Sequence, residues 1–207
     1  GEALWFYYAV QGSRLLPYDM VLALEAPEGD APFASPETFA RYRFLNQKAT
    51  PNNPDALPVG MTRNGDHLGL TCAACHTGQV IYEDVALRVD GAPALIDLIG
   101  FISALEGAVD ATLESDEKLS RYADRVTKGD LAAATLSLQQ AQSFLTTYTA
   151  NFTEVEGGFG RVDAIGAIFN QIVRFTSGST HSRQANAPTS FPMLWDAPRH
   201  DYVQWTG

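Results

Sequence analysis

The sequence predicts a mostly α-helical domain with long irregular loops, and three observations favour this class. Apolar residues recur at helical spacing in four segments that follow residue 91. Residues 47–69 are instead dense in Pro, Asn, Asp and Gly, which is typical of irregular structure. Hydrophobic residues make up 45% of the 207 positions, which is enough to build a core. Because no linker, repeat or low-complexity tract divides the chain, we expect residues 1–207 to form a single domain.

Three short helices are expected before residue 47. The first covers Glu2–Gln11, which is rich in aromatic residues, and Gly12 ends it. The second covers Ser13–Leu24. After a loop rich in proline and glycine, Ser35 marks the start of a third helix over Thr38–Asn46.

Residues 47–69 are expected to be irregular and to lead directly into a pair of cysteines. Long irregular segments in compact domains are usually functional or mobile. The β-type residues of Gln79–Val89 predict a short hairpin that ends at Asp90 and Gly91.

Four longer helices are predicted in the rest of the chain, and the last thirty residues are expected to be irregular. The helices are expected at Ala92–Leu113, Asp116–Thr127, Asp130–Ala150 and Gly160–Thr176, with Asp130 as an N-cap. The apolar residues whose spacing supports the first and fourth are Leu95, Leu98, Ile102, Leu105, Val109, Val162, Ile165, Ile168, Phe169 and Ile172. The core candidates of the third are Leu131, Leu136, Leu138 and Phe144.

The charge of the chain argues against some classes of partner. With 14 basic and 24 acidic residues, the formal net charge is −10. An acidic surface repels phosphate groups, so no nucleic acid is expected as a partner, whereas a basic redox partner would suit it. No run of 18 apolar residues occurs, so no transmembrane segment is expected. Two cysteines three positions apart do not make the framework of a disulfide-stabilised secreted domain.

The sequence Cys72-Ala-Ala-Cys75-His76 is the most specific signal in the chain. The two-residue gap lets each sulfur reach one vinyl-derived carbon of a haem, and the adjacent imidazole can bind the iron from one face. We therefore expect one covalent haem c, with His76 as the proximal iron ligand. A zinc site needs four ligands, and the remaining histidines are scattered. A thioredoxin-like thiol pair would need a βαβ setting, which the pattern does not predict.

The sixth iron ligand would decide the function of such a centre. A methionine or a second histidine suits an electron carrier, whereas an open position lets the iron meet peroxide or dioxygen. For each single candidate the alternative is an ordinary packed methionine or surface histidine. The candidates are Met61, His67, His181, Met193 and His200.

Two arginines and two tryptophans complete the set of candidate site residues. Arg88 and Arg161 match the carboxylate groups of haem propionates, and the alternative is that each pairs with the aspartate two positions further on. Trp195 and Trp205 are candidates for core anchors or electron relays.

Two segments around the motif resemble the di-haem cytochrome c peroxidase superfamily, in particular its rubber-oxygenase-like branch. They run from Gly69 to Gln79 and from Arg88 to Ala94. Further segments that fit the same branch are residues 11–14, 17–18, 22–25, 57–60, 187–192 and 194–196. The resemblance therefore covers most of the chain, although only the haem motif is specific by itself.

The resemblance implies a c-type cytochrome-like helical domain around a haem, a periplasmic or secreted location, and chemistry on peroxide or dioxygen. It also implies two haems in two domains, with Trp195 matching the tryptophan between them. The resemblance further implies that Phe191, Met193 and Leu194 line a distal side left free for oxygen. Because the chain has a single motif, we expect it to be the N-terminal haem domain of a longer di-haem protein.

Three functions follow as alternatives from the sequence. The first is a haem-dependent oxidoreductase domain of the peroxidase or dioxygenase type, with a second haem domain or a separate redox protein as its partner. The second is a mono-haem electron-transfer cytochrome c with a firm sixth ligand. The third is a protein without haem that uses the two thiols for zinc or for redox chemistry.

Overall fold

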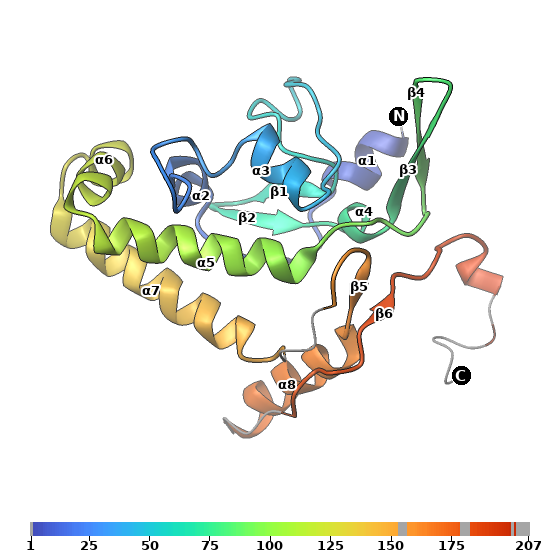
Figure 1. Ribbon diagram of the computed structural model, residues 1–207. Helices are drawn as coiled ribbons and strands as arrows, with labels where there is room; N and C mark the ends of the chain where they lie inside the picture. The colour runs from blue at the N-terminus through green and yellow to red at the C-terminus, as the bar shows by residue number, and fades with distance from the viewer. Residues whose placement is uncertain (1, 153–156, 179–182, 200, 202–207) are drawn as a thin grey trace.

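The computed structural model describes residues 2–152, 157–178, 183–199 and 201 (Figure 1). Within these residues helices predominate, which confirms the prediction of a mostly helical fold. The strands of this part of the chain form three two-stranded antiparallel sheets, and β2 also bridges to Pro17.

The helices and strands have the following bounds. The α-helices are α1 (Glu2–Tyr8), α2 (Tyr18–Ala23), α3 (Pro36–Arg41), α4 (Cys72–Cys75), α5 (Leu98–Glu114), α6 (Asp116–Val126), α7 (Leu131–Thr149) and α8 (Ala164–Ser177), and a 3-10 turn η1 covers Ala197–Arg199. The strands are β1 (Met61–Asn64), β2 (His67–Leu70), β3 (Thr77–Tyr82), β4 (Val85–Asp90), β5 (Arg161–Val162) and β6 (Thr189–Ser190).

Side-chain caps fix where most of the longer helices begin. In each case an oxygen of the cap accepts a hydrogen bond from a backbone N–H of the first turn, which would otherwise lack a partner. The residues that cap α3, α5, α6, α7 and α8 are Ser35, Asp97, Ser115, Asp130 and Asp163. The predicted start at Ser35 and the predicted cap Asp130 are confirmed, and the bounds of α6 and α7 differ from prediction by one residue.

The core lies where α5 packs between α7 and the N-terminal layer (Figure 1). Its centre is Phe101, which is fully buried. The rings of Phe33, Phe39, Tyr42 and Phe44 surround it, with centroid distances between 5.0 and 6.3 Å. Edge and tilted contacts of this kind are the geometry that aromatic rings prefer. The cluster therefore joins α3 and the chain that follows it to α5.

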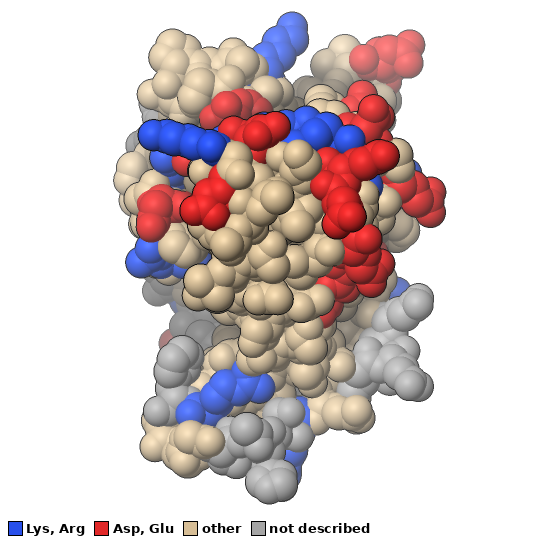
Figure 2. Space-filling model, turned by 90° about the vertical axis from the view of Figure 1, so that its left-hand side faces the viewer, with Lys and Arg blue, Asp and Glu red and all other residues tan. Residues whose placement is uncertain are grey.

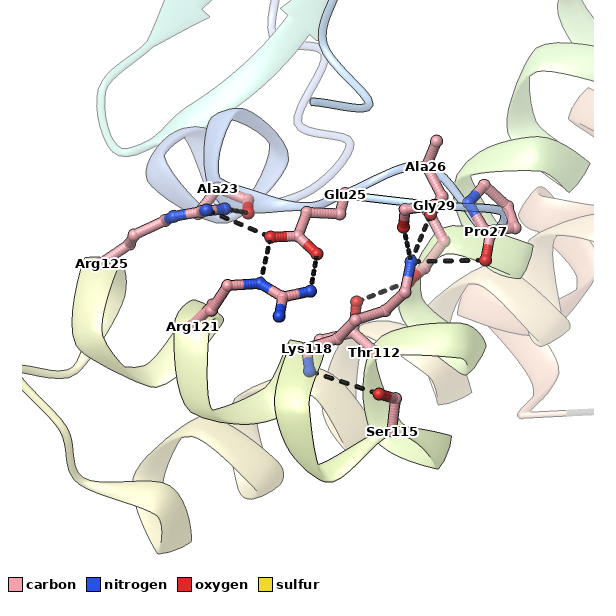
Figure 3. Close-up of polar contacts among 11 residues, drawn as sticks. Ala23, Glu25, Ala26, Pro27, Gly29, Thr112, Ser115, Lys118, Arg121 and Arg125 are labelled. Carbon is pink, nitrogen blue, oxygen red and sulfur yellow. Dashed lines mark hydrogen bonds and ion pairs between the residues drawn. The ribbon is translucent and has the colours of Figure 1, made fainter. Parts of the chain in front are cut away.

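A polar clamp joins α6 to the chain that follows α2 (Figure 3). The carboxylate of Glu25 is almost fully buried and accepts two hydrogen bonds from Arg121, at 2.9 and 2.7 Å, while Arg125 lies 3.1 Å from the same group. The ammonium of Lys118 donates to three backbone carbonyls of residues 26–29. Because its charge is paired, the buried carboxylate is tolerated in the protein interior.

The structure corrects the sequence prediction at several places. The first and third predicted helices end early, at Tyr8 and Arg41, and the helix predicted from Gly160 begins at Ala164. Residues 47–69 are not irregular throughout, because β1 and β2 form a hairpin with the register Met61 to Leu70. The helix predicted from Ala92 begins only at Leu98, since the chain before it is extended and the Ala94 N–H donates to the Cys75 carbonyl. The predicted second helix covers only residues 18–23.

The predicted core is also wrong at several apolar positions. Leu138 is fully buried, but Leu131, Leu136 and Phe144 on the same helix are exposed. The residues of the first and fourth predicted helices that are likewise exposed are Leu95, Ile165, Ile168, Phe169 and Ile172. Helix α8 therefore turns an apolar face outward, whereas the predicted core residues of α5 are buried.

The molecular surface carries charges of both signs. On the face viewed from the α6 end, acidic side chains gather in the upper half together with Lys and Arg, and the centre of the face is uncharged (Figure 2). The net charge of −10 therefore does not form a purely acidic surface on this side. None of the helices in the described residues has the length and apolarity needed to cross a membrane.

Candidate functional site

The Cys-x-x-Cys-His segment forms a single helical turn, α4, directly after β2. The side chain of Thr71 caps this turn by accepting from the Ala73 N–H at 3.3 Å. The N–H of Cys72 donates to the Gln11 side chain at 2.7 Å, and the N–H of His76 donates to the Cys72 carbonyl at 2.9 Å. Both cysteines and the histidine are therefore held on one rigid turn.

Gly60 brings another part of the backbone against this turn. Its φ is +81°, and a Cβ at this position would lie 2.0 Å from the Ala74 nitrogen. The Gly60 carbonyl also accepts from the Thr71 N–H at 2.8 Å. Only glycine allows so close a backbone approach in this conformation. The position of α4 thus depends on the absence of a side chain at residue 60.

The imidazole of His76 is oriented by the C-terminal part of the chain. Its Nδ1 lies 2.8 Å from the Pro192 carbonyl oxygen. A carbonyl oxygen only accepts hydrogen bonds, so Nδ1 carries the proton of the neutral ring and donates it. The lone pair of this tautomer is on Nε2, the opposite nitrogen. A backbone carbonyl on one nitrogen is the usual outer partner of a histidine that binds a metal through the other.

The surroundings of His76 favour its neutral form. Burial lowers the pKa of the imidazole, and the hydrogen bond to Pro192 only partly offsets that effect. The ring of Phe191, which is buried, lies edge-on to the imidazole with 6.2 Å between centroids. At neutral pH the Nε2 lone pair is therefore available to a metal ion.

The two thiols differ in environment. Cys72 is exposed, Cys75 is partly buried, and they are not joined in a disulfide. Burial, with a smaller contribution from Cys72, raises the pKa of Cys75 to about 12, so this group is a thiol at neutral pH. Burial raises the pKa of the nearby Tyr148, and the Cys75 charge adds to this effect.

The segment after Phe191 is bound to the end of β4, next to the motif. The N–H of Leu194 donates to the Gly91 carbonyl at 2.8 Å, and the indole N–H of Trp195 donates to the Asp90 carbonyl at 2.9 Å. The N–H of Gly91 in turn donates to the His76 carbonyl at 2.8 Å. Trp195 is half exposed and is fixed beside the hairpin that follows the motif. Trp205, the other tryptophan considered, lies outside the described residues.

The candidate sixth ligands lie in different parts of the molecule. Met61 is fully buried in β1 and lines a cavity under α1 whose walls include neither cysteine nor His76. The Nδ1 of His67 lies 2.7 Å from the Asp66 carboxylate and 2.8 Å from an Arg14 nitrogen. Met193 is exposed and directly follows Pro192, on the Nδ1 side of the imidazole. The remaining candidates, His181 and His200, lie outside the described residues.

The two candidate propionate ligands are both exposed and lie on different sheets. Arg88, on β4, donates to the Asn46 carbonyl at 2.5 Å. Arg161 lies on β5, opposite Ser190 of β6. Among the described residues neither arginine pairs with the aspartate two positions further on. Asp90 accepts from a tyrosine, and Asp163 caps α8.

Two alternatives without haem, a zinc site and a redox thiol pair, depend on what surrounds the cysteines. No group of three or more His, Cys, Asp or Glu side chains in this part of the chain is arranged to hold a metal ion. A tetrahedral zinc site would need four such ligands. The motif lies between two antiparallel hairpins, β1–β2 and β3–β4, rather than in a βαβ unit. It therefore lacks the setting of a thioredoxin-like thiol pair.

Sequence reasoning missed three groups that position the motif. Thr71 carried a readable signal, since a threonine before a short helical segment is a common N-cap. The Gln11 amide oxygen and the Pro192 carbonyl carried none, because they approach the motif from 61 and 116 positions away. Every residue has a backbone carbonyl, so the residue type does not indicate which carbonyl will contact the motif.

Comparison with known proteins gives one relative. The uncharacterized protein y4iJ of Sinorhizobium fredii (strain NBRC 101917 / NGR234) is 30% identical over 238 aligned residues. The alignment covers 97% of this chain and 39% of that protein, so the chain spans less than half the length of the relative. No family model and no solved structure matches the chain.

Proposed function

We propose that this chain is a haem c domain of an oxidoreductase of the peroxidase or dioxygenase type. The single observation that carries the proposal is the hydrogen bond from His76 Nδ1 to the Pro192 carbonyl. It leaves the Nε2 lone pair of His76 free, on the same turn that presents the free thiols of Cys72 and Cys75. This is the donor set that covalent haem attachment requires.

The residues around the motif fit a haem. The two thiols would form the thioether links, and His76 would be the proximal ligand, oriented by Pro192 and packed on Phe191. The hydroxyl of Thr77, directly after the motif, is buried and has no hydrogen-bond partner among the described residues. A buried hydroxyl of this kind is costly unless another group satisfies it.

The placement of the candidate sixth ligands supports an oxidoreductase over an electron carrier. A haem bound here supplies an iron centre that can react with peroxide or dioxygen when its sixth position is open. Met61 is packed in the core under α1, and His67 is held by Asp66 and Arg14. Met193 follows Pro192 and so starts on the proximal side of His76, where Phe191 also packs, and not on the distal side that the resemblance implies for both. None of these three is therefore poised to close the opposite position.

The proposal extends to location and partner. In bacteria, thioether attachment of haem takes place outside the cytoplasm, so a periplasmic or secreted protein is expected. The chain spans 39% of its relative, which leaves room in such a protein for a second haem domain as electron partner. Trp195, fixed by its bond to Asp90 and half exposed, is then the proposed relay between the two.

Intact mass tests the covalent attachment. Protein matured by a haem c assembly system should carry one haem that survives acid, and the double replacement of Cys72 and Cys75 by serine should remove it. His67→Gln is a matched control that should keep both the adduct and its spectrum. A colourless native protein with two reactive thiols would contradict the proposal.

The visible spectrum separates the oxidoreductase from the carrier. We expect cyanide, CO and peroxide to change the spectrum of the haem-loaded protein, because they occupy an open sixth position. A six-coordinate low-spin spectrum that none of them alters would favour the mono-haem electron carrier instead. Replacing Met61, His67, Met193 and His200 in turn would then identify the ligand.

A further inference from the structure

A cavity separate from the cysteine motif lies under α1. It has a volume of about 510 Å³, within the usual range for small-molecule sites. Figure 1 shows α1 next to β1, and residues of both elements line the cavity. The residues that line the cavity are Leu4, Trp5, Tyr8, Ala9, Tyr18, Asn52, Asn53, Pro54, Asp55, Leu57, Met61, Thr62 and Arg63.

The floor of this cavity is apolar and its rim is aromatic. Tyr18, Leu57 and Met61 are buried beneath it. Trp5 stands on α1 with 71% of its surface exposed, although an indole usually gains stability by burial. Concave sites with apolar walls and a few fixed polar groups are typical ligand sites.

Two opposite charges are fixed on the same tyrosine of this cavity. The hydroxyl of Tyr18 donates to the Asp55 carboxylate at 2.6 Å. The guanidinium of Arg63 lies over the Tyr18 ring, 4.7 Å from its centroid, and its Nε donates to the Gly65 carbonyl. Tyr18 therefore contacts both the carboxylate of Asp55 and the guanidinium of Arg63, and all three residues line the same cavity.

These two charges do not neutralise each other. Among the described residues no ion pair joins Asp55 to Arg63. One oxygen of Asp55 and the terminal nitrogens of Arg63 have no protein hydrogen bond in this part of the chain. Both groups keep capacity for a charge-assisted hydrogen bond, which is the strong kind.

We propose that this cavity binds a small zwitterion with an apolar side chain, such as an apolar α-amino acid. Its ammonium group would bind Asp55 and its carboxylate would bind Arg63. Its side chain would lie against Leu4 and Trp5, the two large exposed apolar residues of the lining. Asp55 and Arg63 are both exposed in the unbound protein, so a zwitterion can gain two charge-assisted hydrogen bonds where a ligand with one charge gains only one.

Calorimetric titration of the protein, in its purified state, with L-phenylalanine tests the proposal. We expect saturable binding with a Kd below about 1 mM. The two single-charge analogues, 3-phenylpropionate and phenethylamine, should each bind at least about tenfold more weakly, since each forfeits one charged hydrogen bond. Equal affinity for phenethylamine or for 3-phenylpropionate would overturn the zwitterion assignment.

Two variants locate the site. Asp55→Asn should abolish the preference for L-phenylalanine over 3-phenylpropionate, and Arg63→Gln should abolish its preference over phenethylamine. Arg41→Gln, an exposed arginine outside the cavity, is the matched control and should bind as the unaltered protein does. Unfolding temperature checks that each variant is folded. Failure to bind L-phenylalanine, or unchanged binding by both variants, would refute the proposal and leave the haem assignment untouched.

Discussion

At the scale of single residues, one hydrogen bond determines which nitrogen of His76 is free to bind a ligand. The Nδ1 of His76 is committed to a carbonyl, so the chemistry of the ring is directed to Nε2. The motif itself could be predicted from the sequence because its spacing is specific. The partner of Nδ1 could not, because it is a backbone oxygen whose position depends on how the last described segment packs.

Replacing Gly60 by alanine should destabilise the protein strongly. The new Cβ would meet the backbone of Ala74 at 2.0 Å, and a positive φ adds strain, so we expect a loss of roughly 3 kcal/mol or more in the free energy of unfolding. Urea denaturation measures the loss. Gly65 also has a positive φ but open space around it, so Gly65→Ala should cost only about 1 kcal/mol. Equal losses for the two variants would contradict the close-approach argument.

At the scale of elements, the sequence predicts that a helix forms better than it predicts where that helix begins and what it packs against. Asp130 fixes the start of α7, and the β3–β4 hairpin was readable from its β-type residues. The β1–β2 hairpin was missed although its two turn residues, Gly65 and Asp66, match the hairpin turns that begin with glycine, since its strands are only four residues long. The start of α5 was misplaced because tertiary hydrogen bonds hold the preceding residues extended.

The clamp between α6 and the chain after α2 predicts how stability changes with pH. The hydrogen bonds from Arg121 lower the pKa of the Glu25 carboxyl below its usual value. The stabilisation is therefore complete above the unfolded-state pKa of about 4.3 and is lost as the pH falls through the lower folded-state value. We expect Glu25→Gln to cost about 2 kcal/mol at pH 7, measured by denaturant titration.

The cost of Glu25→Gln should shrink once the pH falls below about 4, because the carboxyl of the unfolded chain then binds a proton while the carboxylate of the folded protein, with its lowered pKa, does so only at lower pH. Glu83→Gln, in the exposed turn between β3 and β4, is the control and should have little effect at any pH. A constant difference between Glu25→Gln and the unaltered protein from pH 7 to pH 3 would show that the ion pair is not the cause.

Across the whole molecule, stability should be uneven. Helix α5 buries seven residues, whereas α8 leaves Ile165, Ile168, Phe169 and Ile172 exposed. Segments with few buried apolar contacts open at lower free energy. We expect backbone amides of α8 to exchange with deuterium faster than those of α5, as measured by mass spectrometry. Equal protection would mean that another protein surface covers the apolar face of α8 in solution.

The apolar spacing of α8 illustrates the limit of sequence reading at this scale. Periodicity correctly predicted that a helix would form there. It could not predict whether the apolar face would lie against this chain or face outward, because that depends on the placement of distant segments. The same limit explains why the candidate ligands of the motif could be named but not arranged.

The bond between His76 and Pro192 has a consequence for how the protein is made. A ribosome adds about 5–20 residues per second, so the carbonyl emerges on the order of ten seconds after the imidazole, 116 positions later. Throughout that interval the ring is free to rotate and either nitrogen can carry its proton. The orientation and the tautomer of His76 are therefore set only after the segment around Pro192 has been made and has folded back onto the motif.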